Sequence, residues 1–433
     1  MKKYFSLFFF TSLLMGILCA AETLKFTLPE AKKLALEQNP TIAKAQANIE
    51  AAMAGIDRAR SSYFPTVDLN AGIARLRDNA TRPERDYDNT TQYNAGLSAQ
   101  WLIFDGFARR FRYLSASLGG DMAIASCDEA KRLLLEQVSY AYYNVLQAQN
   151  SMEIAQKDAE FNRQLQDDAQ KKKDMGTAKL SEVLNFEYQV RKAEADFIIA
   201  QRSWRIACVT LGQLLNIQQD SIWECLSLVA PSEETAKKEI PQVSTVLDYA
   251  LENRPDLRVA RQEVKNAEFA VKEAQSTWYP TLSAFYNYDF TRNHSAHFNT
   301  HYDRDITYGL KASWNLFNGL DTQASIAQAK ANLMVAQKNL ENLQEQLESE
   351  IRQNCLSLQS AQEVLEKENN LLEIATKIRD LVYEEYIGGT APITRVNEVQ
   401  TDLTNTSLAR SNAWIAVLNA IETLSASTGF ILK

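Results

Sequence analysis

Residues 320–387 read LDTQASIAQAKANLMVAQKNLENLQEQLESEIRQNCLSLQSAQEVLEKENNLLEIATKIRDLVYEEYI and contain neither glycine nor proline, the residues that most readily interrupt a helix. Leu340, Leu343 and Leu347 recur at spacings of three and four, which is a helical period. At 1.5 Å per residue such a helix would be about 100 Å long. The pair Gly388-Gly389 follows at once, where a left-handed backbone can end the helix. A compact globular domain cannot contain this helix, so the chain is expected to form long rods.

The N-terminus has the pattern of a secretory signal peptide. Lys2-Lys3 precede an apolar run that ends at Leu18, and small residues stand just before Glu22. This pattern is typical of an exported protein, so residues 1–21 are expected to be removed. The run is short for a membrane anchor. Lipidation of Cys19 stays open as an alternative, although the bulky residue before it disfavours that reading.

The composition excludes several classes of protein. The formal charge of −8 becomes −10 once Lys2 and Lys3 are removed, and an acidic chain is a poor partner for nucleic acid. The mean hydropathy is −0.32, and no later segment approaches the 18 or so apolar residues of a helical membrane span. Any insertion into a membrane must therefore use β-strands.

The cysteines after the signal peptide do not form a motif. They are Cys127, Cys208, Cys225 and Cys355. Without C-x-x-C spacing, neither a zinc site nor a disulfide framework is indicated. We expect small buried residues, with one disulfide of undetermined pairing left open.

The chain consists of two copies of one plan, because four short motifs recur in the same order at an offset of 213 or 215 positions. They are ALEQNP (35–40) and ALENRP (250–255), SYFPT (62–66) and TWYPT (277–281), WLIFDG (101–106) and WNLFNG (314–319), and GTA (176–178 and 389–391). The predicted segments are a signal peptide (1–21), a first repeat (22–217), a linker or equatorial segment (218–242) and a second repeat (243–433).

Each repeat is expected to contain a short helix, a second helix, two strands, a long helix, a glycine turn and a last helix. In the first repeat the helices are expected at 28–37, 41–62, 107–175 and 179–216. Short polar residues at the strand-to-helix joints, Asp105 and Asn318, are expected to cap the long helices.

The strands alternate apolar and polar residues, with Trp and Tyr in the apolar set. The pattern covers 93–103 and 306–316, covers 282–290 with an interruption at Phe285, and is shortest at 67–73. Strands of about 10 residues with one apolar face are typical of a transmembrane barrel. A soluble sheet with one face on a core is the alternative, but little sequence is left to build that core.

The strand count predicts an oligomer. Four strands cannot close a barrel, since about eight is the practical minimum, and open edges are not tolerated in lipid. A symmetric ring of chains is the economical answer, and three copies would supply twelve strands. The fold class is thus mainly α with a transmembrane β-barrel, formed by an internally duplicated chain.

The duplicated plan and the turn motifs GTAKLSEV (176–183) and GTAPITRV (389–396) resemble the outer membrane efflux protein family of TolC-like channels. The resemblance covers nearly the whole chain after the signal peptide. It implies a homotrimer with a 12-stranded β-barrel in the outer membrane of a Gram-negative bacterium and a long periplasmic α-helical barrel. It also implies partners, a periplasmic adaptor (membrane fusion protein) and an inner-membrane transporter, and the role of exit duct in a tripartite efflux pump or type I secretion system.

The resemblance also points to functional residues at the two helical turns. Gate residues carried over by position are Glu182 and Glu398, and Arg395 stands where an acid is common in the family. We hypothesise that Arg395 pairs with one of these acids and holds the tube shut, in place of the arginine that Ala391 replaces. The alternative is that all three are solvated helix charges. The residues expected to bind the adaptor are Gly176, Thr177, Ala178, Leu180, Gly389, Thr390, Ala391 and Ile393.

Other patterns predict no chemistry. His294, His297 and His301 have the spacing H-x2-H-x3-H, but they fall in a polar hairpin loop and no catalytic Glu accompanies them, so a solvated loop is expected instead of a metal site. No nucleophile motif or phosphate-binding glycine loop is present, which predicts a protein that is not an enzyme and needs no cofactor. The alternative function is a periplasmic coiled-coil adaptor or scaffold without a pore.

Overall fold

The computed structural model describes residues 24–77, 89–217, 222–237, 239–295 and 301–432, so the predicted signal peptide lies outside the described residues. The chain divides into two units. The sheet unit is formed by residues 46–126 and 256–343, and the helical unit by residues up to 45, 127–255 and 344–433.

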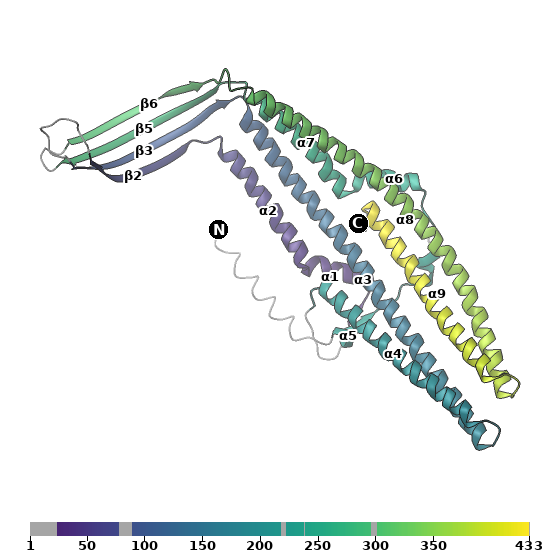
Figure 1. Cartoon of the computed structure of the whole chain (residues 1–433). Helices are drawn as coiled ribbons and strands as arrows, with labels where there is room; N and C mark the ends of the chain where they lie inside the picture. The colour runs from purple at the N-terminus through teal and green to yellow at the C-terminus, as the bar shows by residue number, and fades with distance from the viewer. Residues whose placement is uncertain (1–23, 78–88, 218–221, 238, 296–300, 433) are drawn as a thin grey trace. The chain divides into compact units, whose positions relative to one another are not determined.

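The sheet unit contains four antiparallel strands in the order β2-β3-β5-β6 (Figure 1). They are β2 (Thr66–Arg77), β3 (Asn89–Asp105), β5 (Thr281–Ser295) and β6 (His301–Ser313). The expected end of the first strand at Ile73 is four residues short, because β2 stays paired with β3 as far as Arg77. The expected last strand is too long, because β6 ends at Ser313. Within the described residues β2 and β6 are the two unpaired edges.

The two faces of the sheet differ in chemistry. The apolar face carries the row Val67, Ala99, Tyr286 and Tyr308, and the polar face carries the next row, Asp68, Ser98, Asn287 and Thr307. The large apolar side chains are uncovered; Leu69 is 79% and Tyr308 is 76% exposed. The predicted alternation is confirmed, and Phe285 belongs to a continuous β5 in which it lies on the polar face.

The joints between strand and long helix have the same backbone in both repeats. Each joint has two consecutive left-handed residues, Gly106 (φ 66°) and Phe107 (φ 71°) in one repeat, and Gly319 (φ 68°) and Leu320 (φ 71°) in the other. A residue with a side chain is strained in this left-handed region, whereas glycine is not.

The predicted caps differ between the joints. Asp105 Oδ2 accepts a hydrogen bond from the backbone N–H of Arg109 at 2.9 Å, which confirms the cap in the first repeat. In the second repeat, Asn318 Nδ2 donates to the Thr322 hydroxyl at 2.7 Å, a side-chain contact in place of the expected backbone cap.

The predicted long helices are confirmed as α3 (Ala108–Asp174) and α8 (Asp321–Ile387), each of 67 residues. The sheet unit holds their first turns beside α2 (Pro40–Ser61) and α7 (Pro255–Ser276). Helix α3 passes through Gly119-Gly120 without a break. A Cβ added to Gly120 would lie 3.0 Å from Ile56 Cδ1 of α2, so this glycine allows the two helices to approach closely.

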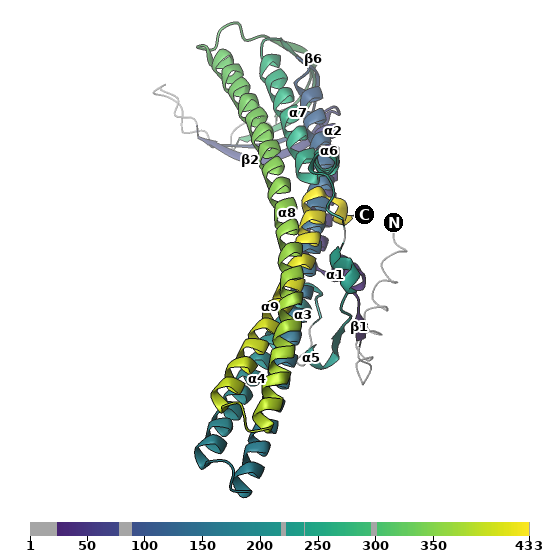
Figure 2. The same ribbon diagram turned by 90° about the vertical axis from the view of Figure 1, so that its right-hand side faces the viewer.

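The helical unit contains two hairpins, in which α3 is followed by α4 (Leu180–Leu214) and α8 by α9 (Ile393–Thr428). The four helices run side by side and both turns lie at the same end of the unit (Figures 1 and 2). Between hairpins, Asn150 Nδ2 of α3 donates to the Ser411 hydroxyl of α9 at 3.0 Å.

Short elements pack against the long helices of the helical unit, away from the two turns. They are β1 (Leu24–Phe26), α1 (Leu28–Gln38), α5 (Ile222–Cys225), β4 (Leu226–Leu228), a 3-10 helix (Glu233–Lys237), α6 (Val243–Asn253) and a final 3-10 helix (Phe430–Leu432). Strands β1 and β4 pair in parallel. The hydroxyl of Tyr142 lies 2.9 Å from the Phe26 carbonyl and 2.7 Å from the Val229 carbonyl, which ties this pair to α3.

In both repeats a side chain donates a hydrogen bond to a carbonyl at the C-terminal end of the last helix. Asn39 Nδ2 donates to the carbonyl of Leu214 at the end of α4, at 2.8 Å. Arg254, the corresponding residue of the second repeat, donates to the carbonyl of Ser427 at the end of α9, at 3.0 Å. These carbonyls have no partner within their own helix, so a side-chain donor stabilises each helix end.

The expectation of small buried cysteines is confirmed for Cys127, Cys208 and Cys355, which are free thiols. The side chain of Cys225 lies outside the described residues. None of the helices in the described ranges has an apolar window long enough to cross a membrane.

Candidate functional site: the hairpin turns of the helical unit

The two turns share one local structure. Gly176 and Gly389 have left-handed backbones, with φ of 75° and 82°, as expected for residues that end a helix. Thr177 donates both its backbone N–H and its hydroxyl to the Lys172 carbonyl, each at 2.9 Å. Thr390 does the same to Glu385, at 2.9 Å and 3.0 Å. The threonine thus satisfies a carbonyl that the end of the helix leaves without a partner.

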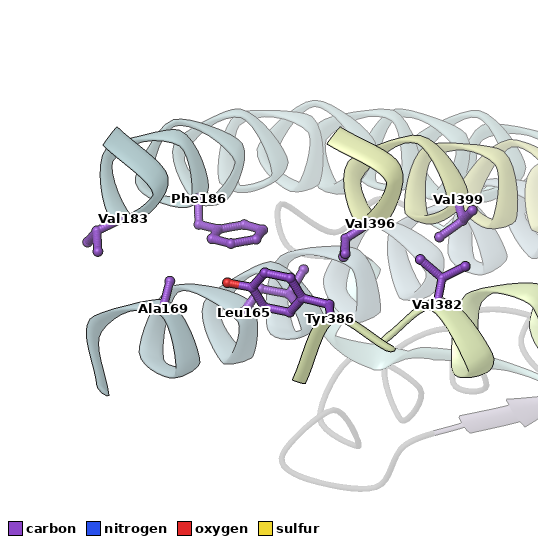
Figure 3. Packing of buried hydrophobic residues seen from close by; sticks show 8 residues of the cluster. All are labelled: Leu165, Ala169, Val183, Phe186, Val382, Tyr386, Val396 and Val399. Carbon is purple, nitrogen blue, oxygen red and sulfur yellow. The ribbon is translucent and has the colours of Figure 1, made fainter. Parts of the chain in front are cut away.

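A hydrophobic cluster beside the turns joins the two hairpins, and we call it the tip core (Figure 3). It consists of Leu165, Ala169, Val183, Phe186, Val382, Tyr386, Val396 and Val399. Phe186 of α4 and Tyr386 of α8 are its largest members, with ring centres 5.8 Å apart in an edge-to-face arrangement. The cluster draws on all four long helices, so burial of its apolar surface holds the hairpins together.

Polar contacts surround the tip core. The Tyr383 hydroxyl of α8 donates to Asp168 Oδ2 of α3 at 2.9 Å and accepts from Gln164 Nε2 at 2.7 Å. Burial and the nearby Asp168 raise the pKa of Tyr383, so its hydroxyl stays a donor at neutral pH. Asn397 Nδ2 of α9 donates to Asn185 Oδ1 of α4 at 2.8 Å, so the other two helices are also linked by a hydrogen bond.

Lys172 adds a charged link between the hairpins. Its ammonium group donates to the Tyr386 carbonyl at 2.5 Å and lies 4.0 Å from the centre of the Tyr386 ring, within cation–π range. Burial, and then the negative charges of Glu182 and Asp168, raise the pKa of Tyr386 to about 12. Tyr386 is therefore neutral at physiological pH.

The structure places the predicted gate residues as follows. Arg395 Nη1 lies 2.7 Å from Glu398 Oε2, one turn along the same helix, and both side chains are about half exposed. Of the two partners considered for Arg395, the structure thus pairs it with Glu398. This pair is internal to α9, so it does not by itself join two helices. Glu182 belongs to the first turn of α4, near enough to Tyr386 to influence its pKa.

The residues expected to bind the adaptor fall into two groups. Gly176, Thr177, Gly389 and Thr390 are exposed at the turns, and Leu180 is 56% exposed. Ala391 and Ile393 are partly buried and pack against the tip core, and Ala178 is also partly buried.

Sequence reasoning missed Lys172, Asp168 and Tyr383, which make polar contacts between α3 and α8. Tyr383 and Tyr386 stand one helical turn apart just before Gly388, but such a pair is equally typical of ordinary helix packing. Their partners lie more than 200 positions away, and one sequence contains no signal for that pairing.

The side chains of His294, His297 and His301 lie outside the described residues. Among the residues that are described, no three His, Cys, Asp or Glu side chains are grouped so as to hold a metal.

The chain is similar to known proteins over most of its length. The sequence model of a family described as "Outer membrane efflux protein" matches residues 32–216 and 246–430. Outer membrane protein TolC of Escherichia coli is 25% identical over 391 residues, covering 87% of this chain and 76% of that protein. Protein CyaE of Bordetella pertussis is 23% identical, covering 71% of this chain. The alkaline protease secretion protein AprF of Pseudomonas aeruginosa is 25% identical, covering 68% of this chain.

Two of these matches span less than two thirds of the relative, namely 63% of CyaE and 62% of AprF. Among solved structures, the CmeC outer membrane channel of Campylobacter jejuni superposes with a TM-score of 0.80 at 17% identity, covering 93% of this chain and 85% of CmeC. That likeness concerns the fold.

Proposed function

Because the chain belongs to the outer membrane efflux protein family, we propose that three copies form one channel in the outer membrane, with their helices extending into the periplasm. The observation that carries the proposal is the four-stranded sheet with two unpaired edges. Four strands are half of the roughly eight that a closed barrel needs, and an unpaired edge is costly in lipid. Pairing β2 of one copy with β6 of the next removes every edge and gives twelve strands.

The apolar face of the sheet supports a place in lipid. Ile73, Leu310 and Tyr308 are between 69% and 76% exposed, and no other described part of the chain covers them. Such a face is stable only against hydrocarbon or another protein. In the proposed barrel it faces lipid, and the polar face lines the lumen.

The helices carry a second uncovered surface that fits a ring of copies. Large apolar side chains are at least half exposed along α4 and α8; they are Leu180, Leu184, Tyr188, Ile198, Ile199, Ile206 and Val209 on α4, and Met334, Val335, Leu356, Val364, Leu371, Ile374 and Leu381 on α8. A contact between α4 of one copy and α8 of the next is heterologous, and such contacts close a ring when the rotation allows it.

The ring of three copies would serve as the exit duct of a tripartite efflux pump or a type I secretion system. Its partners would be a periplasmic adaptor, which binds the exposed turn residues such as Thr177, Leu180 and Thr390, and an inner-membrane transporter. The similarity to AprF, a protease secretion protein, supports the secretion role, and the similarity to CmeC, an outer membrane channel, supports the conduit.

The contacts between hairpins would act as the gate. The hydrogen bond from Tyr383 to Asp168 and the Lys172 ammonium on Tyr386 must break for the hairpins to separate. Glu182 of α4 and the pair Arg395–Glu398 of α9 lie on the other helices of the two hairpins and would tune the gate by charge. Each exposed ion pair contributes only about 0–1 kcal/mol, so the binding of an adaptor can open such a gate.

The test is assembly and conductance. The protein extracted from membranes by detergent is expected to have the mass of three chains and to form ion channels in planar bilayers. Ile198→Asp places a charge in the uncovered stripe of α4 and should reduce the trimer fraction. Met175→Asp, at an equally exposed residue of the turn, should not.

A single chain that stays soluble without detergent and conducts no ions would instead support the periplasmic scaffold without a pore.

A further inference from the structure

The polar face of the sheet has an apolar exception near the joint with the helices. Successive rows across the strands are Asn70, Gly96, Asp289 and Asp305, then Asp68, Ser98, Asn287 and Thr307, then Thr66, Gln100, Phe285 and Gly309. Among the residues whose side chains the structure describes, the apolar ones at polar-face positions are Ala74, Leu102 and Phe285. Phe285 is the only one of them with an aromatic ring.

Phe285 lies on the glycine directly opposite it. Phe285 of β5 and Gly309 of β6 are register partners, and a Cβ added to Gly309 would lie 3.3 Å from Cζ and 3.4 Å from Cε1 of the ring. The tip of the ring therefore lies over Gly309 of β6. A methyl group at residue 309 would require the ring to shift by a few tenths of an ångström.

Other glycines of this face accommodate polar side chains in the same way. Asn94 lies over its register partner Gly72, and Asp289 lies over its register partner Gly96. Asp289 thereby leans toward β3 and away from Asp305, its like-charged register partner on β6. Like charges directly opposite each other destabilise a strand pair, so this displacement has a physical reason. A phenylalanine has no such reason to lie on a polar face.

We infer that Phe285, contributed once by each copy, is a contact in the channel wall for the apolar rings of transported molecules. The inference rests on the proposed function, in which the polar face lines the lumen. The ring is then part of the lumen wall, where its apolar surface gains by contact with another ring. Leu102, a diagonal neighbour on β3, extends the apolar surface next to it.

The charges on the polar face of the sheet favour one class of transported molecule. Its described side chains include the acids Asp68, Asp289, Asp303 and Asp305 and a single base, Lys311. Asp289 is four residues from Phe285 on the same strand, about 14 Å at the rise of a β-strand. An acidic wall attracts cations. The contact therefore suits cationic molecules that carry apolar rings.

The experiment measures how long single molecules block the current of one channel in a planar bilayer. Tetraphenylphosphonium and tetraethylammonium have the same charge, and only the first has aromatic rings. With the wild-type protein the first should block about 2- to 12-fold longer, the range that one aromatic contact provides. Tetraphenylborate, with four rings and a negative charge, should block more briefly than tetraphenylphosphonium.

The variants distinguish a role of the Phe285 ring in contacting transported molecules from a role in folding. Phe285→Ser should bring the ratio of the two cation block times close to one, and Phe285→Tyr should keep the wild-type ratio. Phe290→Ser is the matched control, because Phe290 is on the same strand but on the apolar face, and it should also keep the ratio. If Phe285→Ser does not assemble, Phe285→Leu tests the loss of the ring in a side chain that stays apolar.

A ratio unchanged in Phe285→Ser or in Phe285→Leu would overturn the inference. So would loss of channels in both variants while Phe290→Ser conducts, because the role of Phe285 would then be to support the sheet. Equal blocking by tetraphenylborate would overturn the preference for cations. If the wild-type protein forms no channel at all, the proposed function itself fails, which is a distinguishable result.

Discussion

The Tyr383 hydroxyl of α8 donates a hydrogen bond to the Asp168 carboxylate of α3 at 2.9 Å, and the two residues are 215 positions apart. The bond lies beside the tip core and joins the two hairpins of one chain. A hydrogen bond to a charged group is stronger than one between neutral groups, but this one is partly open to solvent. In the proposed channel such a bond would hold the turns together and could still be broken by a partner.

We predict that Tyr383→Phe opens the channel more often. The change removes the hydroxyl and keeps the ring. At about 1 kcal/mol the loss of the bond should raise the open fraction about 5-fold. Single-channel recording in bilayers measures this fraction. Tyr140→Phe, at an exposed tyrosine of α3, is the control and should leave it unchanged. Equal open fractions in the two variants would show that the Tyr383 bond is not part of the gate.

Phe186→Ala should loosen both turns. Phe186 is fully buried in the tip core, and removing a buried phenylalanine side chain costs about 3–5 kcal/mol. Amide hydrogen exchange should therefore become faster at residues 160–190 and 380–400, in both hairpins. Met175→Ala, at a residue that is 70% exposed, is the control. Faster exchange confined to 160–190 would contradict the view that one core joins the hairpins.

The two joint glycines should differ in their tolerance of alanine. A Cβ at Gly106 would overlap the Ser276 carbonyl oxygen and lie 2.9 Å from Tyr279 Cβ, whereas a Cβ at Gly319 meets no atom within 4 Å. Gly319→Ala should therefore cost only the strain of a left-handed residue, about 1–2 kcal/mol. Gly106→Ala adds a steric clash and should lower the thermal midpoint of the detergent-solubilised protein further. Equal midpoints for the two variants would be inconsistent with this packing.

Glu136→Gln should stabilise the protein at neutral pH. Burial is the main cause that raises the pKa of Glu136, while Arg132 opposes it. A raised pKa means that the folded state disfavours the carboxylate. The stabilisation from the protonated group is thus complete below the ordinary value of 4.5 and is lost as pH rises through the folded pKa.

The gain in thermal midpoint from Glu136→Gln should therefore be largest at pH 7 and vanish as the pH falls to 4. Melting curves across this range measure it, with the exposed Glu160→Gln as the control. A gain that grows on acidification would contradict the assigned direction of the shift.

Much of the fold could be predicted from local patterns. Helix α8 begins and ends within one residue of the segment that lacks glycine and proline, because helix formation depends on neighbours three and four positions away. The strands follow from alternation, and the turns from Gly176 and Gly389. The errors are at strand ends, where β2 continues to Arg77 because its pairing with β3 stabilises residues that do not fit the alternation.

The candidate site likewise has a part that the sequence predicts and a part that it does not. The turns were predictable because a glycine and a following threonine determine their backbone locally. The pairing of Arg395 with Glu398, within reach on one helix, was among the predicted alternatives. The contact of Lys172 with Tyr386 was not, because it depends on how two hairpins are packed together.

The sequence by itself therefore determined the lengths of the helices, the duplication, the two faces of the sheet and the positions of the turns, all of which depend on short-range periodicity and backbone preference. Only the tertiary structure decided that Tyr383 meets Asp168, that Arg254 caps α9 and that Phe285 lies on Gly309. The reason is that contacts between separate elements are selected by burial and register along whole helices and strands, and no short segment encodes that alignment.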